Sequence, residues 1–296
     1  MTSSNIFYIH ALSPIHMGTG AAVGGIDLPH SRESATGLPN VPGSGIKGVW
    51  RDQFSADNKS RLFGAERHGE ESSRNQGALL FSDAWLLCMP VMSYVGDFAW
   101  VTSPMSLARF GRERRFVNPQ ETQLPALPKV ALSSACRTED CVLAHAEHLY
   151  LHELKIQAVS CESTNAWAKL VAGEIFQGDA SYQQEFVKRF IVVGDAELVH
   201  LSHAAAYVPM RNKLGENKQV ESGALWSEEC MPSESIFWGT VGADSLMKVS
   251  AKDSLDQFVE LASSIPRLQF GGKASVGRGM CRFVMPQSNA VENQVK

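Results

Sequence analysis

The chain has 296 residues, of which 44% are hydrophobic, and these are enough to build a substantial core. This length suits two average domains or one elaborated domain with long insertions. The formal net charge is only −4, which excludes a protein that holds nucleic acid by overall positive charge. Contacts with phosphates must therefore come from local clusters of cations, and the arginine- and lysine-rich stretches at 109–115 and 211–218 are candidates.

The six cysteines are scattered, with no C-x-x-C pair and no compact disulfide spacing. This usage is typical of a reduced chain. The first residues lack a basic segment followed by an apolar run, and no apolar stretch approaches the roughly 18 residues of a membrane span. We therefore expect a cytoplasmic location, with neither secretion nor membrane insertion.

The N-terminal part predicts one strand, one long loop and one helix. Residues 5–13 alternate as a strand does, and residues 14–43 lose all periodicity and are rich in glycine and proline. Ser44 is the predicted N-cap of a helix whose apolar residues recur at spacings of three and four. Lys47 falls in the first turn, where the helix dipole favours an acid, so a cation there indicates an anion nearby.

From residue 77 to residue 204 the pattern predicts strands and helices around one irregular segment at 118–137, within an expected insertion at 103–145. Strands are expected at 77–88, 147–160 and 190–194, and a further strand pair at 91–101. Helices are expected at 103–110, 167–171 and 183–189, and a further one begins at Asp195.

The C-terminal part contains a polar stretch at 207–232, framed by Pro209 and Pro232, which predicts a hairpin projecting from the body. Strands at 236–241 and 279–284, with a helix at 255–262 between them, would complete the sheet. The tail from residue 287 is polar and expected to fray. The element order is compatible with a single α+β domain over 1–296, with a ferredoxin-like (RRM-like) core and large insertions.

Glycines and cations mark both ends of the chain. Residues 270–279 read FGGKASVGRG. Near the other end, residues 16–29 read HMGTGAAVGGIDLP and are followed at 39–54 by PNVPGSGIKGVWRDQF, which carries the cations. Glycine permits positive φ and close approach of backbone N–H groups to a ligand, and neighbouring cations favour an anion. The order G-x-x-x-x-G-K-[ST] of a nucleotide-triphosphate loop is absent, which favours a nucleic-acid backbone as the ligand. A plain glycine-rich turn between two strands is the structural alternative for residues 270–279 taken alone.

Several separated motifs resemble the RAMP superfamily of CRISPR-associated proteins. They are HALSPIHMGTG, GSGIKGVWRD, LFG followed by GALLFSDA, and FGGKASVGRGMCRF. Within that superfamily, GGIDLPHSRESATGLPNVPGSGIKG and ESGALWSEECMP resemble the repeating backbone subunit, subunit four, of the type III-B Cmr effector complex. The resemblance covers nearly the whole chain.

The resemblance implies an endoribonuclease subunit that polymerises along a CRISPR guide RNA and cleaves complementary single-stranded target RNA at regular intervals. Its partners would be the guide, the target, other Cmr subunits and further copies of itself. It also implies an active-site loop at 14–43 and a thumb-like hairpin at 207–232 that reaches over the neighbouring copy.

The resemblance assigns target cleavage to Asp27, which would hold a divalent ion, Mg or Mn, or orient the ribose 2′-hydroxyl. Attack of that hydroxyl on the adjacent phosphate would leave a 2′,3′-cyclic phosphate and a 5′-hydroxyl. His16 is a candidate proton donor or hydrogen-bond partner, and Glu221 a candidate second carboxylate from an adjacent copy. From the sequence alone, Asp27 also fits a turn former and His16 a structural loop histidine.

The candidate RNA-binding residues combine cations, glycines and one aromatic ring. They are Lys47, Arg51, Lys273, Arg278, Gly271, Gly272, Gly277 and Trp226. A surface salt bridge for Arg51 and a core-anchoring role for Trp226 are the structural alternatives. Two other functions remain open: a purely architectural RNA-binding subunit with an inert Asp27, and a guide-RNA processing ribonuclease of the same superfamily.

Overall fold

The computed structural model describes residues 4–20, 25–64, 77–120, 123–214, 217–244 and 251–286. Its central strand is β1 (Ser4–Ala11), which pairs antiparallel with β12 (Ile236–Ala243) on one side and with β14 (Met280–Val284) on the other. Strands from the two ends of the chain therefore lie side by side. Because β1 and β14 are antiparallel, the segment that follows β1 and the segment that precedes β14 leave the sheet at the same end of these strands.

The remaining strands extend this sheet in both directions, in the order β13-β14-β1-β12-β4-β5-β9-β6-β8-β7. Two short strands lie off this path, with β2 paired to β4 and β3 paired to β12. The bounds are β2 Asn40–Val41, β3 Leu79–Phe81, β4 Ala84–Ser93, β5 Asp97–Thr102, β6 Ser134–Arg137, β7 His148–Leu151, β8 Leu154–Ser160, β9 Phe190–Val192 and β13 Leu268–Gln269. The pairs β5–β9 and β6–β8 are parallel, so the sheet is mixed.

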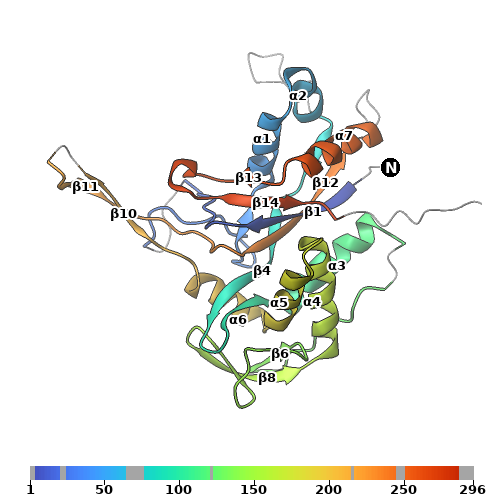
Figure 1. Ribbon diagram of the computed structural model, residues 1–296. Coiled ribbons are helices and arrows are strands. Elements are labelled where there is room, and N and C mark those ends of the chain that lie inside the picture. The colour runs from blue at the N-terminus through green and yellow to red at the C-terminus, as the bar shows by residue number, and fades with distance from the viewer. Residues whose placement is uncertain are drawn as a thin grey trace, which may run out of the picture.

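Helices cover both faces of the sheet (Figure 1). One group, drawn above the central strands, is α1 (Gly43–Gln53), α2 (Ala56–Phe63) and α7 (Ala251–Ser264). The other group, drawn below them, is α3 (Pro104–Val117), α4 (Glu162–Ile175) and α5 (Ala180–Arg189). The class is therefore mixed α+β, as the sequence predicts.

The alternation of β1 explains why two cores form. Phe7 points to the α1 and α7 side, where its ring stacks on Phe283 with centroids 4.8 Å apart, and Trp50 of α1 meets the same Phe283 at 4.9 Å. Tyr8 points to the opposite side, where its ring lies 5.9 Å from Phe110 of α3. Successive side chains of a strand face opposite ways, so one apolar strand supplies both cores.

A separate two-stranded sheet projects from the body. It consists of β10 (Met210–Leu214) and β11 (Val220–Ser227), which pair only with each other and extend away from the other strands in Figure 1. The helix α6 (Asp195–Ala204) precedes this hairpin. Its root lies where Tyr207 and Cys230 form an isolated antiparallel bridge.

Several local predictions differ from the structure. The strand predicted at 147–160 is divided into β7 and β8, and the helices predicted at 167–171 and 183–189 are longer, as α4 and α5. The helix predicted after Ser44 begins at Gly43, with Pro42 as a cap without a side-chain bond, because the carboxylate of Asp83 accepts the Gly43 N–H at 2.8 Å. The single strand predicted at 77–88 is divided into β3 and β4, since the Ser82 hydroxyl replaces a backbone group in accepting the N–H of Thr240.

The helix predicted at 103–110 continues to Val117 as α3. The predicted fraying of the tail from residue 287 lies outside the described residues. Among the described helices, none has the length and apolar character needed to cross a membrane.

Candidate nucleic-acid interface and active site

The two glycine-rich segments meet, as the sequence predicts. The N–H of Gly272 donates to the carbonyl of His16 at 3.1 Å, and the N–H of Gly279 donates to the carbonyl of Pro14 at 2.9 Å. Gly271 has φ of 80°, and a Cβ built on it would lie 2.2 Å from the carbonyl oxygen of His16. Only glycine allows this approach. We call the surface formed by 14–20 and 270–279 the glycine junction.

Asp27 lies in the loop that leads away from the glycine junction, with its side chain exposed. Its Oδ2 accepts hydrogen bonds from the backbone N–H of Ser227 at 2.8 Å and from the Ser227 hydroxyl at 2.9 Å. These bonds, the backbone one first, lower the pKa of Asp27 and outweigh its slight desolvation. The other carboxylate oxygen, Oδ1, has no partner among the described residues. Asp27 is thus an oriented, ionised carboxylate with one available oxygen.

His16 is buried beneath the glycine junction, 4% exposed. Its Nδ1 lies 2.7 Å from the carbonyl oxygen of Glu229, and because a carbonyl only accepts, Nδ1 carries the hydrogen. In the neutral form of this ring, Nε2 would carry an unshared electron pair. A Cβ at Gly18 would lie 2.9 Å from that Nε2, so this glycine leaves the ring edge uncovered. Within the described part of the chain, no hydrogen bond joins His16 to Asp27.

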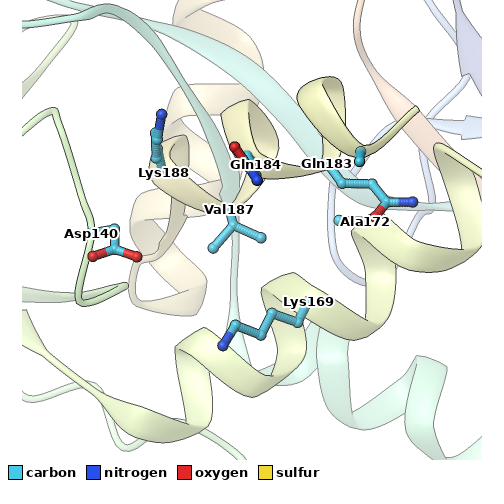
Figure 2. Close-up of a pocket in the computed structure, with 8 residues that line it drawn as sticks. Asp140, Lys169, Ala172, Gln183, Gln184, Val187 and Lys188 are labelled. Atoms are coloured by element: carbon cyan, nitrogen blue, oxygen red, sulfur yellow. The ribbon is translucent and has the colours of Figure 1, made fainter.

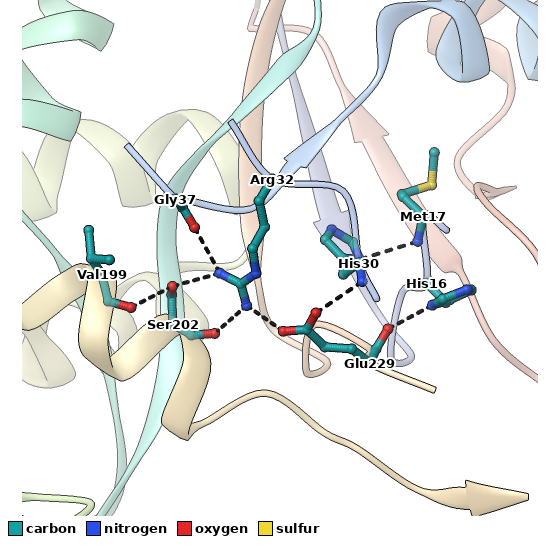
Figure 3. A network of polar contacts seen from close by, with 8 residues as sticks. All are labelled: His16, Met17, His30, Arg32, Gly37, Val199, Ser202 and Glu229. Atoms are coloured by element: carbon teal, nitrogen blue, oxygen red, sulfur yellow. Dashed lines mark hydrogen bonds and ion pairs between the residues drawn. The ribbon is translucent and has the colours of Figure 1, made fainter. Parts of the chain in front are cut away.

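A buried network around Glu229 holds this loop in place (Figure 3). The Glu229 carboxylate accepts the backbone N–H of His30 at 3.0 Å and pairs with the Arg32 guanidinium at 2.5 Å. Arg32 also donates to the carbonyl of Gly37 at 2.9 Å and to the hydroxyl of Ser202 in α6 at 3.0 Å. Glu229 therefore ties the loop beyond Asp27 to α6 and, through its backbone carbonyl, to His16.

Glu228, the preceding residue, contacts the other side of the glycine junction. Its side chain is 1% exposed, and its Oε1 accepts from the Lys273 ammonium and from the Trp226 indole N–H, each at 2.9 Å. Its Oε2 lies 3.5 Å from Nε of Arg211. Burial by itself would raise the pKa of Glu228, but the bonds from Trp226 and Lys273 prevail and lower it. Neither Glu228 nor Glu229 was a candidate from the sequence, although two adjacent glutamates within LWSEECMP were a usable signal.

The predicted RNA-binding residues fall into two groups. Lys273, Arg278 and Trp226 lie together, with the Lys273 ammonium 5.7 Å from the Trp226 ring and the Arg278 guanidinium 4.7 Å from the ring of Tyr207. The backbone of Gly272 and Gly277 beside them is exposed. This group connects the glycine junction to the root of the hairpin.

The second group lies on α1. The Lys47 ammonium donates to the carbonyl of Leu79 in β3 at 3.0 Å. Desolvation, and then the charge of Arg51, lower the pKa of Lys47. The carboxylate at this helix start, Asp83, accepts the N–H of Gly43, and the anion predicted beside Lys47 stays a prediction.

Glu221 is not brought to Asp27 within one chain. It lies on β11, paired with Lys213 of β10 at 2.8 Å. From Glu221 to Ser227, where Asp27 is bound, the strand rises about 20 Å. The predicted arginine cluster at 109–115 is also not a free basic patch, because Arg109 binds Glu33 at 2.8 Å and Arg114 binds Glu174 at 2.5 Å.

The donor set at Asp27 does not by itself fit a resident metal ion. Hard divalent cations take six or more oxygen ligands, and Asp27 offers one available carboxylate oxygen. In the ranges that the structure describes, no group of three or more histidine, cysteine, aspartate or glutamate side chains is placed to hold a metal. The metal-binding role of Asp27 stays a prediction.

A surface groove of about 400 Å³ lies apart from these residues, between α4 and α5 (Figure 2). Lys169, Gln183 and Gln184 line it over a floor that includes Val187. Lys188 at its edge is already paired with Glu185 at 2.9 Å. None of these residues belongs to the glycine junction or to the root of the hairpin, so the groove is not part of the candidate site.

We predict that Gly271→Ala destabilises the protein by about 2 to 4 kcal/mol, because it adds a clash to a left-handed backbone. Gly277→Ala is the matched variant: its φ is 76°, but its Cβ would meet nothing within 4 Å. Strain alone should cost about 1 kcal/mol there. Urea unfolding of both variants measures the difference, and equal losses would contradict the close contact at His16.

A second prediction concerns His30, whose Nδ1 accepts the Met17 N–H at 3.2 Å. Burial, then the charges of Arg32 and His16, lower the pKa of His30 to about 3. Below about pH 6.5 the unfolded chain binds a proton at His30 and the folded chain does not. Lowering the pH therefore lowers the free energy of unfolding, by up to about 1.4 kcal/mol per pH unit. His30→Gln should flatten that slope between pH 7 and 5 in urea unfolding, whereas exposed His145→Gln should not. Equal slopes in all three proteins would contradict a buried neutral His30.

Comparisons with known proteins agree on one family. The sequence profile of the RAMP superfamily matches residues 8–282. The CRISPR system Cmr endoribonuclease Cmr4 of Pyrococcus furiosus is 27% identical over 299 residues, which covers 94% of this chain and 94% of the relative.

Solved structures share the fold. The crystal structure of oligomeric Cmr4 from Pyrococcus furiosus superimposes with a TM-score of 0.72 at 20% identity, covering 97% of this chain and 99% of that one. A chain of the type III-B Cmr-beta complex bound to cognate target RNA gives a TM-score of 0.72 at 19% identity, covering 95% of this chain and 96% of that one. Together with the profile match over nearly the whole sequence, these findings establish that the chain belongs to the RAMP superfamily.

Proposed function

We propose that this protein is the backbone subunit of a type III-B CRISPR Cmr ribonucleoprotein, in which it binds guide RNA and cleaves complementary target RNA at regular intervals. The observation that carries the proposal is the exposed, oriented carboxylate of Asp27 beside the glycine junction. The proposal is also supported by a relative that aligns with 94% of this chain and is named an endoribonuclease. Sequence recognition would come from base pairing, while the protein holds the backbone.

The proposal divides one domain into a core and its additions. The strand order β14-β1-β12-β4, with α1 and α7 packed through Trp50 and Phe258, supports a ferredoxin-like (RRM-like) core. The segments between β4 and β12 would then be insertions, including 103–145. The loop 14–43 would be the active-site loop, and 207–232 the thumb that contacts a neighbouring copy.

The guide RNA would follow the glycine junction. Gly271, Gly272 and Gly277 have no side chains, so a phosphate could approach their backbone closely. The N–H groups of Gly272 and Gly277 are already donated to the carbonyls of His16 and Ala274, so the cations nearby would supply the hydrogen bonds to phosphate. Arg278, Lys47 and Arg51 would neutralise charge along the path, and the partly exposed Trp226 would pack on a nucleotide. Further copies, other Cmr subunits and the two RNAs are the partners, in a cytoplasmic complex.

The cleavage that this site supports is a transfer of the phosphodiester to the ribose 2′-oxygen. Asp27 would accept a hydrogen bond from the 2′-hydroxyl and direct its oxygen at the adjacent phosphorus. The new bond joins the 2′-oxygen to phosphorus and the bond to the 5′-oxygen breaks, so the 2′-proton is released and the 5′-oxygen gains one. His16 Nε2 would exchange a proton or hydrogen bond at the phosphate, and Glu221 of an adjacent copy would add a second carboxylate. A divalent ion, Mg or Mn, would when bound offset phosphate charge.

Asp27→Asn tests the catalytic assignment. The amide keeps the size of the side chain but loses the charge, so we expect target cleavage by the assembled complex to fall by at least about 100-fold. Guide binding should be unchanged, because Asp27 is placed at the target. The rate of cleavage is measured on gels with end-labelled target RNA, and the products are checked for cyclic phosphate ends.

The same assay separates the two other functions. Undiminished target cleavage with Asp27→Asn would indicate the architectural role, in which another component cuts. Cleavage of precursor guide RNA by the isolated chain would indicate the processing role.

Ser227→Ala tests the orientation of the carboxylate. The variant removes the hydroxyl bond to Oδ2 and leaves the backbone bond, so Asp27 stays ionised but is held less firmly. We expect cleavage to slow by about tenfold, or roughly 1.4 kcal/mol of barrier. Ser263→Ala on α7, whose hydroxyl donates to the Val259 carbonyl, is the control. A wild-type rate for Ser227→Ala would remove Ser227 from the site.

A further inference from the structure

We propose that Glu228 is a positioning residue whose ion pair with Lys273 fixes the C-terminal glycine loop to the root of the hairpin, and that Lys273 acts through this pair and not as a phosphate ligand. The inference rests on the proposed guide-RNA binding. It assigns a structural role to Lys273, which the sequence predicts to bind the guide RNA.

The environment of Glu228 requires a bound cation. Its side chain is 1% exposed, whereas that of Lys273 is 36% exposed. A buried carboxylate is strongly unfavourable without a charged partner and hydrogen bonds, and removing one partner of such a pair is more costly than the pair is worth. Arg211 lies farther off, at 3.5 Å from Oε2. Transfer of Lys273 to a phosphate would therefore leave Glu228 poorly compensated.

The backbone of Lys273 gives a second, independent observation. Its φ is 68°, the left-handed region that Gly271 and Gly277 occupy in the same loop. A residue with a Cβ costs about 1 kcal/mol there, a cost that glycine would avoid. A strained backbone is kept where the surroundings determine it, and here the ammonium reaches the buried Oε1 at 2.9 Å.

Glu228 is placed to connect three segments. Its side chain binds Lys273 of the C-terminal loop, and its backbone N–H donates to the carbonyl of Pro209 at the start of the hairpin. Its backbone also forms a parallel bridge with Leu28, the residue after Asp27. Loss of the ion pair should thus shift the glycine loop relative to Asp27, even though neither charged group touches the scissile bond.

The experiment is a double-mutant cycle with Glu228→Gln, Lys273→Met and both together, read out in two ways. The first is urea unfolding without RNA, where we expect the second substitution to add little to the first. The second is guide-RNA binding as a function of salt. We expect each single variant to weaken guide-RNA binding by about tenfold. The double variant should bind no more weakly than the weaker-binding single variant. The slope of log affinity against log salt should stay that of the wild-type protein.

Phosphate binding by Lys273 predicts different results. Losing one phosphate contact lowers the slope of log affinity against log salt by about 0.7 for a single strand. That loss for Lys273→Met alone, with additive effects in the cycle, would overturn the inference. Lys252→Met on α7 controls for the loss of one exposed lysine.

Two further comparisons keep the test decisive. Should Glu228→Gln fail to fold, Lys273→Met alone still decides: weaker binding with the wild-type salt slope supports the ion pair, and weaker binding with a lower slope supports a phosphate contact. Wild-type protein that fails to bind guide RNA would count against the proposed function. The urea-unfolding cycle needs no RNA, so independent effects of Glu228→Gln and Lys273→Met in that cycle would overturn the ion pair itself.

Discussion

Two adjacent buried carboxylates at the root of the hairpin organise the candidate site. Glu228 binds Lys273 of the C-terminal glycine loop, and Glu229 binds Arg32 and the backbone of His30 in the N-terminal loop. Neighbouring residues of an extended chain point to opposite sides, so one dipeptide holds both loops. Each bond is maintained because an unpaired buried charge costs several kcal/mol. The positions of His16 and Asp27 depend on this arrangement, since both are bonded to residues 227–229.

Sheet topology explains how distant parts of the sequence reach this place. β1 pairs with both β12 and β14, so the loop after β1, the segment before β12 and the loop before β14 leave the sheet at one edge. Gly272 and Gly279 then bond directly to His16 and Pro14. The close approach requires glycine at position 271, because any Cβ there would strike the His16 carbonyl. The chemistry of the site is thus a consequence of strand order more than of any local motif.

The sequence predicts the parts of this structure that local patterns determine. The alternation at 5–13 is β1, the glycine-rich ends meet, and the polar stretch at 207–232 contains the hairpin strands. What the sequence could not supply is the pairing of charges across the fold. Arg109 was expected in an open basic cluster but binds Glu33, and Lys47 was expected at an anion but donates to the Leu79 carbonyl. Such partners come from elements that only the tertiary structure brings together, and the same holds for Asp83 at the start of α1.

The hairpin has a mechanical consequence. Among the described strands, β10 and β11 pair with no other, so the contacts at the root of the hairpin set the orientation of this two-stranded sheet. β11 has eight residues, which is a lever arm of about 27 Å at the usual rise per residue. A tilt of about 10° at the root of the hairpin would move the tip by about 5 Å, which is about the spacing of two hydrogen-bonded strands. A small displacement of a residue at the root of the hairpin would therefore move the tip much farther than the residue itself moves.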